Sequence, residues 1–278
     1  MTSTNCHVVV PVYRPLTPVE TIVVSNNARM LRDYPFVVIG PKGAREALSQ
    51  AETLIRAAGS EARIQPFPDR DFAGISGYNA LLKTRRFLDS FDGADFILIC
   101  QTDAVILDDD LGRWLASGYD FVGAPHFVGY KELSLPVRFA KGANGGLSLR
   151  NLRAARVALD RVNILPRTLL AKSVVRTGLA ALSARTLGTK MCIIPKPNLN
   201  EDVLWSVEIP GCDPDFRVAP PEVAAGFAFE VLPRHLMELR GGRLPFGCHA
   251  WQRYDQEFWL SVFPRKLSDD LRRAIAET

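Results

Sequence analysis

The residues best suited to chemistry follow the segment Phe96 to Cys100, F-I-L-I-C, a continuous apolar run of strand length. A run without polar positions is typical of a central strand that is covered on both faces. It stops at Gln101, Thr102 and Asp103, so a carboxylate is expected at the carboxyl end of a buried strand. Ligands of open α/β sheets bind at that edge, which makes Asp103 a candidate site residue. Its position alone fits a turn or cap residue about equally well.

A glycine-rich segment, Gly142 to Gly146, precedes an alternating Leu-Ser-Leu-Arg stretch that is typical of a strand. Three of its five residues are glycines, which let a backbone approach a ligand closely or turn sharply. The pair Asn144-Gly145 is equally typical of a plain hairpin turn. A ligand-contacting loop and a structural turn therefore both remain open.

Two acidic residues and a histidine complete the candidates. Glu201 and Asp202 lie in the first turn of an expected helix, where the helix dipole favours acidic side chains whether or not they have a function. His249 lies between aromatic residues in the glycine-flanked segment Gly247 to Trp251. A single histidine is more often structural than a ligand, and only its neighbours raise His249 above the other histidines of the chain.

The elements that must position these residues alternate between strand and helix. We expect strands at 7–12, 36–39 and 62–67, with helices at 17–32 and 44–58 between them. This order implies parallel pairing with right-handed crossovers. No G-x-G-x-x-G follows the first strand, so a dinucleotide-dependent oxidoreductase has little support. Further along the chain we expect helices at 76–91, 108–117, 200–205 and 268–278, and a strand at 119–126.

Length and composition bound the class of protein. With 278 residues and 47% hydrophobic content, the chain is expected to form one domain, residues 1–278, with an insertion. The net charge of +4 gives no indication of nucleic-acid binding. Five cysteines without a C-x-x-C pair favour reduced thiols over a disulfide framework or structural zinc. The sequence has no signal peptide and no run of about 20 apolar residues, so we expect a cytoplasmic protein.

The insertion is a local charge asymmetry. Residues 161–200 contain seven Lys or Arg and no Asp or Glu, in a Leu- and Ala-rich setting. We interpret residues 161–199 as a basic helical insertion, most simply a solvated helical hairpin. Its cations also suggest peripheral contact with the inner face of a membrane, although they do not fall on one helix face.

Five segments, in order, resemble a known family. They are Q-T-D-A-V-I, Y-D-F-V-G-A-P, G-A-N-G-G-L-S-L-R, N-E-D-V-L-W and G-C-H-A-W, within about residues 60–260. Together they resemble the glycosyltransferase-like family catalogued as domain of unknown function 5672, in the nucleotide-diphospho-sugar transferase superfamily. The resemblance implies a Rossmann-like glycosyltransferase A fold, with a mostly parallel central sheet flanked by helices.

The resemblance also implies a metal site. The D-x-D signature of the fold corresponds to residues 101–103, with Gln101 in place of the first carboxylate. Asp103 and His249 are therefore the expected ligands of Mn²⁺ or Mg²⁺, which would bridge to the pyrophosphate of the donor. The loss of one carboxylate is expected to weaken metal affinity.

The resemblance assigns substrate contacts to other motif positions. The donor would be a nucleotide-diphosphate sugar and the acceptor a glycan or lipid-linked hydroxyl, as in polysaccharide biosynthesis. Expected donor contacts are Pro11, Val12, Tyr13, Arg14, Asn79, Lys83, Gln101, Thr102 and Asp103. Expected sugar or acceptor contacts are Asn144, Gly145, Gly146 and Trp251.

Catalysis is expected to depend on Asp202 as general base, with Glu201 as the adjacent catalytic candidate. A single displacement of this kind inverts the anomeric centre, whereas double displacement needs a carboxylate nucleophile that the sequence does not identify. The alternative is a catalytically inactive glycan- or nucleotide-binding domain of the same fold, which Gln101 favours. A two-metal phosphohydrolase would need more clustered carboxylates or histidines than this sequence offers.

Overall fold

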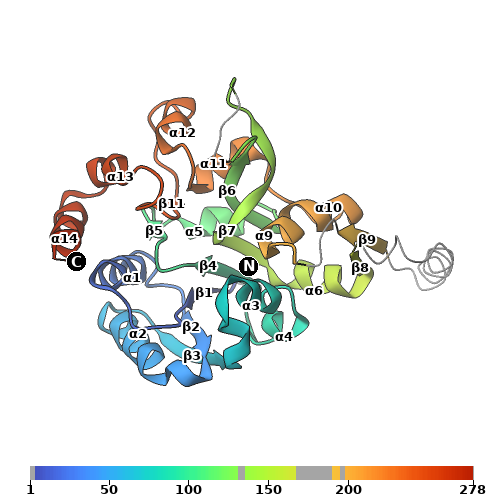
Figure 1. The fold of residues 1–278 in the computed structure, drawn as a ribbon, viewed down its shortest axis with the longest axis horizontal. Helices are drawn as coiled ribbons and strands as arrows, with labels where there is room; N and C mark the ends of the chain where they lie inside the picture. The colour runs from blue at the N-terminus through green and yellow to red at the C-terminus, as the bar shows by residue number, and fades with distance from the viewer. Residues whose placement is uncertain (1–3, 131–134, 167–189, 195–197, 278) are drawn as a thin grey trace.

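The computed structural model describes residues 4–130, 135–166, 190–194 and 198–277, and a six-stranded sheet lies at its centre (Figure 1). In spatial order the strands are β3 (Ala62–Phe67), β2 (Phe36–Pro41), β1 (Cys6–Pro11), β4 (Phe96–Cys100), β7 (Phe139–Asn151) and β6 (Phe121–Phe127). The first four pair in parallel, whereas β7 is antiparallel to both of its neighbours. The parallel half has the strand order of a Rossmann-like sheet. The predicted α/β class with a mostly parallel central sheet is confirmed.

Strand β4 is buried on both faces, as its uninterrupted apolar sequence predicted. Phe96 and Leu98 belong to the core on one face of the sheet, while Ile97 and Ile99 belong to the core on the other. The alternation follows from the two-residue repeat of a strand. Helices cover both faces of β4, and the polar residues that directly follow it, Gln101 to Asp103, become partly exposed at the sheet edge.

Two groups of helices cover the sheet. The core on one face includes residues of α1 (Pro18–Met30), α2 (Arg45–Ala57), α5 (Leu111–Leu115) and α11 (Pro221–Phe227). The other core includes residues of α3 (Gly74–Leu81), α4 (Arg85–Leu88), α6 (Leu152–Arg161), η3 (Leu204–Glu208) and α10 (Ile209–Cys212). Figure 1 shows α1 and α2 on the opposite side of β1 from α3, α4 and α6. Short 3₁₀ turns, η1 (Lys42–Ala44) and η2 (Asp69–Phe72), connect β2 to α2 and β3 to α3.

A smaller sheet lies beside the end of β4 and brings the C-terminal part of the chain to it. Its strands, in order, are β10 (Ala228–Phe229), β11 (Gly247–Cys248) and β5 (Val105–Ile106). Strand β11 is antiparallel to β5. The third core lies under this sheet and includes residues of α12 (Pro233–Leu239), α13 (Gln256–Val262) and α14 (Arg265–Ala276).

Two sequence predictions about elements were wrong. The helix expected at 76–91 is two short helices, because the Thr84 hydroxyl accepts a hydrogen bond from the Phe87 backbone and starts α4 as a new helix. The expected helical insertion at 161–199 begins and ends in strands, β8 (Val162–Pro166) and β9 (Lys190–Ile194), which pair in parallel. The rest of the insertion, 167–189 and 195–197, lies outside the described residues.

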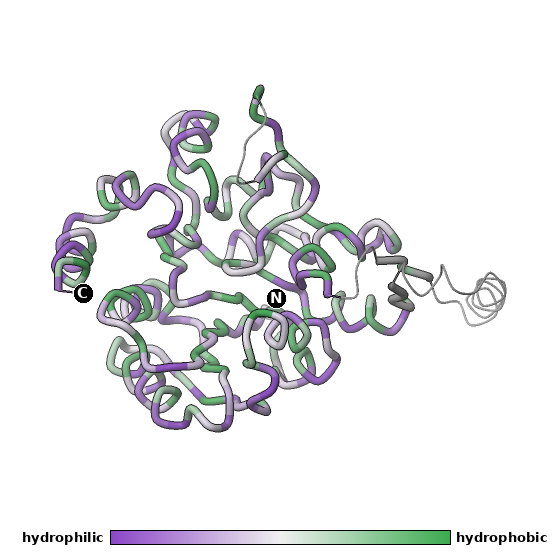
Figure 2. Tube along the Cα trace, viewed as in Figure 1, coloured by the Kyte–Doolittle hydropathy of each residue, from purple (hydrophilic) through white to green (hydrophobic). Residues whose placement is uncertain are grey.

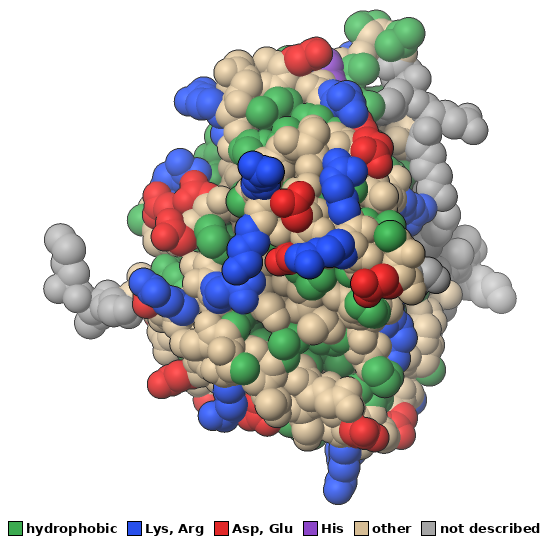
Figure 3. Space-filling model, turned by 90° about the vertical axis from the view of Figure 1, so that its left-hand side faces the viewer, with side chains coloured by type: hydrophobic (Ala, Val, Ile, Leu, Met, Phe, Trp, Pro, Cys, Tyr) green, Lys and Arg blue, Asp and Glu red, His purple; other side chains and the backbone are tan. Residues whose placement is uncertain are grey.

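The hydropathy of the chain follows this layering. Figure 2 shows apolar segments in the central strands and alternating polar and apolar positions along the outer helices. On the face in Figure 3, Lys and Arg side chains are interspersed with Asp and Glu. Among the described helices, none is long and apolar enough to cross a membrane.

Asn27 fixes the loop that follows β4. This buried side chain on α1 donates a hydrogen bond to the Ala104 carbonyl (2.6 Å) and accepts one from the Ile106 amide (2.9 Å). It thereby satisfies backbone groups that lie in the core and that no water can reach. Asp103 directly precedes this clamp, so the position of its carboxylate depends on Asn27.

We expect Asn27→Ala to lower the free energy of unfolding by about 3 kcal/mol, because two buried backbone groups lose their partners. Asn26→Ala is the comparison variant: Asn26 is only partly buried and donates one bond to the Ile106 carbonyl (3.1 Å) and a longer one to Asn27 Oδ1 (3.4 Å), so its loss should be smaller. Urea denaturation measures both variants. Equal losses for the two would contradict the assignment of the clamp to Asn27.

Candidate active site

The tip of β4 presents one accessible carboxylate. The backbone amide of Gln101 donates a hydrogen bond to the Gly146 carbonyl (2.9 Å), which joins the tip to β7. The Thr102 hydroxyl donates to Glu20 (2.8 Å) at the start of α1. Asp103 remains 44% exposed at its side chain. Hydrogen bonds to β7 and to α1 therefore fix this tip on both sides, and the Asp103 side chain stays accessible to solvent.

His249 lies directly beside Asp103. His249 directly follows strand β11, and its backbone amide donates a hydrogen bond to the Phe229 carbonyl (2.9 Å). Its Nε2 lies 3.4 Å from Asp103 Oδ1 and 3.1 Å from Gln101 Oε1. A Cβ at Gly146 would overlap the imidazole ring, so this glycine is what allows His249 to approach.

A second carboxylate orients the imidazole. Glu230 is 3% exposed, and its Oε1 lies 3.2 Å from His249 Nδ1. Burial opposes a charge on His249, but the hydrogen bonds and charges of Asp103 and Glu230 outweigh it and raise the pKa to about 10. The imidazole of the metal-free protein is therefore protonated at neutral pH, and a metal ion would have to displace a proton.

The donors at this tip suit a divalent cation. A carboxylate on Nδ1 turns Nε2 of a histidine outward, which is the usual arrangement behind a metal-binding imidazole. Neighbouring ligands of an octahedral ion with bonds of about 2.1 Å lie about 3 Å apart, close to the separations around Nε2. Within the described ranges, no group of three or more His, Cys, Asp or Glu side chains is arranged to hold a metal. A metal would thus have Asp103 and His249 as its charged and imidazole ligands, with Gln101 beside them.

The two acidic residues at the start of α9 (Glu201–Val203) have different environments. Glu201 is buried and forms a bidentate ion pair with Arg150 of β7 (2.6 and 3.0 Å). Burial raises the pKa of the Glu201 carboxyl, while Arg150 favours the anion. The Glu201 carboxylate is therefore buried and fully engaged by Arg150, which makes Asp202 the better candidate for the expected catalytic role. A catalytic role for either acid stays a prediction.

Asp202 is the acid that remains available. It is partly exposed, and its Oδ1 accepts a hydrogen bond from the Val203 amide (2.7 Å). Burial raises the pKa of Asp202, and the charge of Glu230 adds to this shift. A carboxylate with a raised pKa is better suited to accept a proton near neutral pH. The helix continues as the π-helical segment η3, a feature that is frequent at functional sites.

The glycine-rich segment packs against side chains of the protein itself at the candidate site. A Cβ at Gly145 would overlap the Glu201 carboxylate and approach the Asp202 side chain to 3.1 Å. The absence of a side chain at Gly146 likewise leaves room for the His249 ring. The space above these glycines is thus filled by Glu201 and His249, which corrects the expectation that both glycines lie directly against a sugar. Asn144 is half-buried beside them and donates to Glu230 (3.1 Å).

The loop after β1 borders the same edge. Tyr13 is 59% exposed, while Val12 is buried and Pro11 ends the strand. Arg14 forms a bidentate ion pair with Glu20, the residue that accepts the Thr102 hydrogen bond. Glu20 therefore links this loop to the tip of β4. The expected contact of Pro11 to Arg14 with a donor nucleotide stays a prediction.

Three other residues were predicted to contact substrate, and each contacts groups of the protein itself in the structure. Asn79 Oδ1 accepts from the Glu201 amide (2.7 Å), and Lys83 donates to the Leu199 carbonyl (2.6 Å). Both support the segment that carries Asp202, and their contact with the donor stays a prediction. Trp251 is fully buried and packs edge-on against Phe263, so its expected acceptor contact was wrong.

Sequence reasoning missed Glu20, Arg150 and Glu230. Arg150 ends an alternating Leu-Ser-Leu-Arg stretch, so a charge at an inward strand position was a usable signal for a buried partner. Glu230 follows the short segment G-F-A-F, which carries no motif. Only the pairing of β10 with β11 brings Glu230 next to His249.

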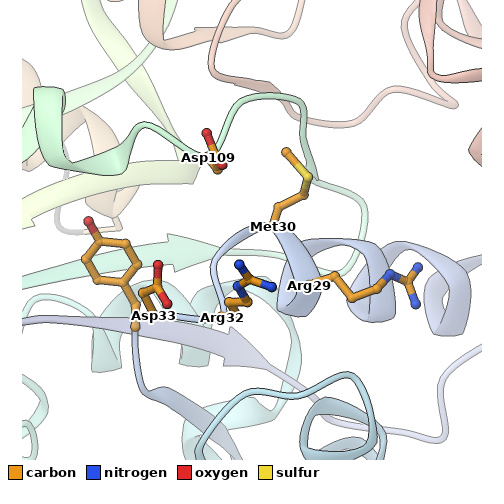
Figure 4. Close-up of a pocket in the computed structure, with 6 residues that line it drawn as sticks. Arg29, Met30, Arg32, Asp33 and Asp109 are labelled. Atoms are coloured by element: carbon orange, nitrogen blue, oxygen red, sulfur yellow. The ribbon is translucent and has the colours of Figure 1, made fainter.

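A hollow of about 300 Å³ lies elsewhere, at the opposite edge of the parallel strands. In Figure 4 the end of α1, with Met30, faces the loop of Asp109 across it. Its lining residues are Arg29, Met30, Arg32, Asp33, Tyr34 and Asp109. None of them belongs to the groups gathered around Asp103.

A sequence model of the family described as protein of unknown function (DUF5672) matches residues 61–249, more than half of the chain. The chain therefore belongs to this family, as the motifs predicted. No curated protein matches it.

Solved structures similar to the chain include the galactosyltransferase LgtC in complex with donor and acceptor sugar analogs. It is 14% identical, with a TM-score of 0.46, over 87% of this chain and 86% of that chain. S. aureus TarS in complex with UDP-GlcNAc is 10% identical, with a TM-score of 0.36, over 57% of this chain and 48% of that chain.

We expect Arg150→Met to lower the free energy of unfolding by about 3–5 kcal/mol, because Glu201 would remain buried without a cation. The double variant Arg150→Met, Glu201→Gln should recover part of this loss, since no buried charge is left. Arg156→Met is the control, as its partner Asp89 is exposed and such pairs contribute about 1 kcal/mol or less. Urea denaturation measures all three, and a double variant no more stable than Arg150→Met would argue against the pair.

Proposed function

We propose that the protein is a glycosyltransferase that moves a sugar from a nucleotide-diphosphate sugar to an acceptor hydroxyl with inversion. The observation that carries the proposal is the open carboxylate of Asp103 beside an oriented imidazole, with Asp202 next to the adjoining glycine segment. A metal-phosphate site and a general base are the two groups that such a transfer needs, and the described residues can supply both.

The metal would be Mn²⁺ or Mg²⁺, with Mn²⁺ favoured by an imidazole ligand. When bound through Asp103 and His249, it would neutralise the charge that develops on the departing nucleotide diphosphate. Glu230 would hold the imidazole in the orientation that the metal needs, and Gln101 would offer its neutral amide oxygen. A neutral ligand in place of a carboxylate is expected to make metal binding weaker.

Asp202 would act on the acceptor. Its carboxylate would take the proton of the acceptor hydroxyl as the oxygen bonds to the anomeric carbon. The bond between that carbon and the phosphate oxygen breaks, and the diphosphate leaves with the electron pair. Glu201 does not share this role, because Arg150 occupies its carboxylate.

The acceptor would be a glycan or a lipid-linked hydroxyl. A lipid-linked acceptor would agree with a cytoplasmic enzyme that contacts the inner face of a membrane through residues 161–199, whose cations each contribute about 1 kcal/mol near an anionic surface. The competing function is a catalytically inactive binding domain, for which Gln101 is the main support. Hydrolysis of nucleotide sugars in the presence of Mn²⁺ discriminates between the two.

We expect Mn²⁺ to increase the affinity for UDP or GDP in the parent protein. Asp103→Ala should abolish this increase, with a loss of about tenfold or more, because the metal loses its open carboxylate ligand. Calorimetric titration of both nucleotides with and without Mn²⁺ is the measurement. Asp109→Ala is the matched control, since Asp109 is an exposed carboxylate on the following loop. Equal affinities in Asp103→Ala and the parent would rule out the metal role.

Asp202→Asn is expected to fold, to bind the nucleotide like the parent, and to turn over about 10²- to 10⁴-fold more slowly, as general bases typically contribute. Turnover is measured as transfer or hydrolysis of UDP- and GDP-sugars. Glu208→Gln, on the same helical segment, should remain as active as the parent. Parent-like turnover in Asp202→Asn would place the base elsewhere.

A further inference from the structure

A relay of polar groups extends from Glu230 away from the metal donors. Glu230 Oε1 accepts hydrogen bonds from Asn144 Nδ2 (3.1 Å) and the Tyr130 hydroxyl (3.4 Å), besides its contact with His249. Tyr130 in turn accepts from the Tyr254 hydroxyl (3.2 Å). Within the described part of the chain, Glu230 Oε2 is buried and has no partner. The carboxylate is therefore the inner end of this relay.

The relay leaves one defined position for a ligand. Each hydroxyl donates inward, from Tyr254 to Tyr130 and from Tyr130 to Glu230. Burial and the charge of Glu230 raise the pKa of Tyr130, so that hydroxyl keeps its proton. The oxygen of Tyr254 at the outer end keeps a lone pair, so it can accept a hydrogen bond from a donor such as water or an alcohol.

Aromatic rings surround this position. The ring centroids of Tyr130 and Tyr254 lie 6.5 Å apart, and the His126 ring lies 6.0 Å from that of Tyr130. All three residues are half-buried, so they are partly open to solvent. Tyr130 has φ 38°, a left-handed conformation that is rare for a bulky residue and that tends to occur at functional sites.

The inner end of the relay adjoins the candidate base. Asn144, which donates to Glu230, is next in sequence to Gly145, and a Cβ at Gly145 would lie 3.1 Å from the Asp202 Cβ. The charge of Glu230 contributes to the raised pKa of Asp202, which agrees with this placement. The tyrosines therefore extend from the part of the structure that also carries Asp202.

We propose that Tyr130, Asn144, Tyr254 and Glu230 form a subsite for a neutral sugar of the acceptor. The inference rests on the proposed function in one respect: the bound sugar is called the acceptor because the protein is proposed to transfer a sugar to it. Binding of this sugar does not itself require a donor. Alcohol groups of a neutral sugar can donate to Tyr254, and the rings offer faces for its C–H groups. An ionised carboxylate or phosphate group cannot be the donor to Tyr254, and the negative charge of Glu230 opposes it, whereas Arg253 beside Tyr254 favours it.

Binding of neutral saccharides tests the subsite. The probes are methyl glycosides of glucose, galactose, mannose and N-acetylglucosamine, maltose and lactose, with glucose 6-phosphate and glucuronate as anionic counterparts. Saturation-transfer NMR and calorimetry are run with and without UDP. We expect at least one neutral probe to bind more tightly than both anionic probes.

Two conservative variants locate the binding. Tyr254→Phe removes the outer oxygen and Tyr130→Phe interrupts the relay, and each should weaken binding of the neutral probe about tenfold. Tyr34→Phe, at the opposite edge of the sheet, should leave it unchanged. UDP affinity should be unchanged in Tyr254→Phe and in Tyr34→Phe, so loss of the subsite is distinguishable from loss of donor binding; Tyr130→Phe is left out of this comparison because Tyr130 contacts Glu230.

Three results would overturn the proposal. One is that no neutral probe binds under either condition, and another is that Tyr254→Phe and Tyr130→Phe bind it as well as the parent does. The third is preferential binding of an anionic probe, which would assign the surface to Arg253, whose guanidinium lies 5.3 Å from the Tyr254 ring centroid. Failure of UDP binding alone would count against the glycosyltransferase proposal and not against the subsite.

Discussion

The buried ion pair between Arg150 and Glu201 is the interaction on which the candidate site depends. It joins the central sheet to the start of α9 through two short hydrogen bonds in a region without water. Such a pair contributes little net stability, but either charge alone would be strongly destabilising. The pair therefore fixes where α9 begins, and with it the position of Asp202. Gly145 makes the arrangement possible, because a side chain there would overlap Glu201.

The same segment couples the two halves of the site. Gly145 lies against the acids of α9, and Gly146 lies against His249 from the smaller sheet. The Gly146 carbonyl also accepts from Gln101 at the tip of β4. Three elements that are far apart in the sequence thus meet on two adjacent glycines. A substitution at Gly145 would displace the acids of α9, and one at Gly146 would displace His249.

Glu230 connects the metal donors with the surface of tyrosines. One oxygen of this buried carboxylate orients His249 and also ends the relay from Tyr254. A change in the hydrogen bonds of this carboxylate at one side therefore affects its contact with the other, because both use the same oxygen. This placement relates the proposed metal site and the proposed sugar subsite through a single side chain.

The sequence by itself determined the strand positions of the central sheet, because these depend on local apolar patterns. It also determined the polar tip at Asp103, because Asp103 closely follows the end of β4 at Cys100 in the sequence. It also brought His249 and the glycine segment into consideration through motif resemblance. Only the tertiary structure decided which groups pair. It buried Glu201 and Trp251 and placed Glu230 behind His249, because burial and ion pairing depend on strand neighbours distant in the sequence, which no local pattern encodes.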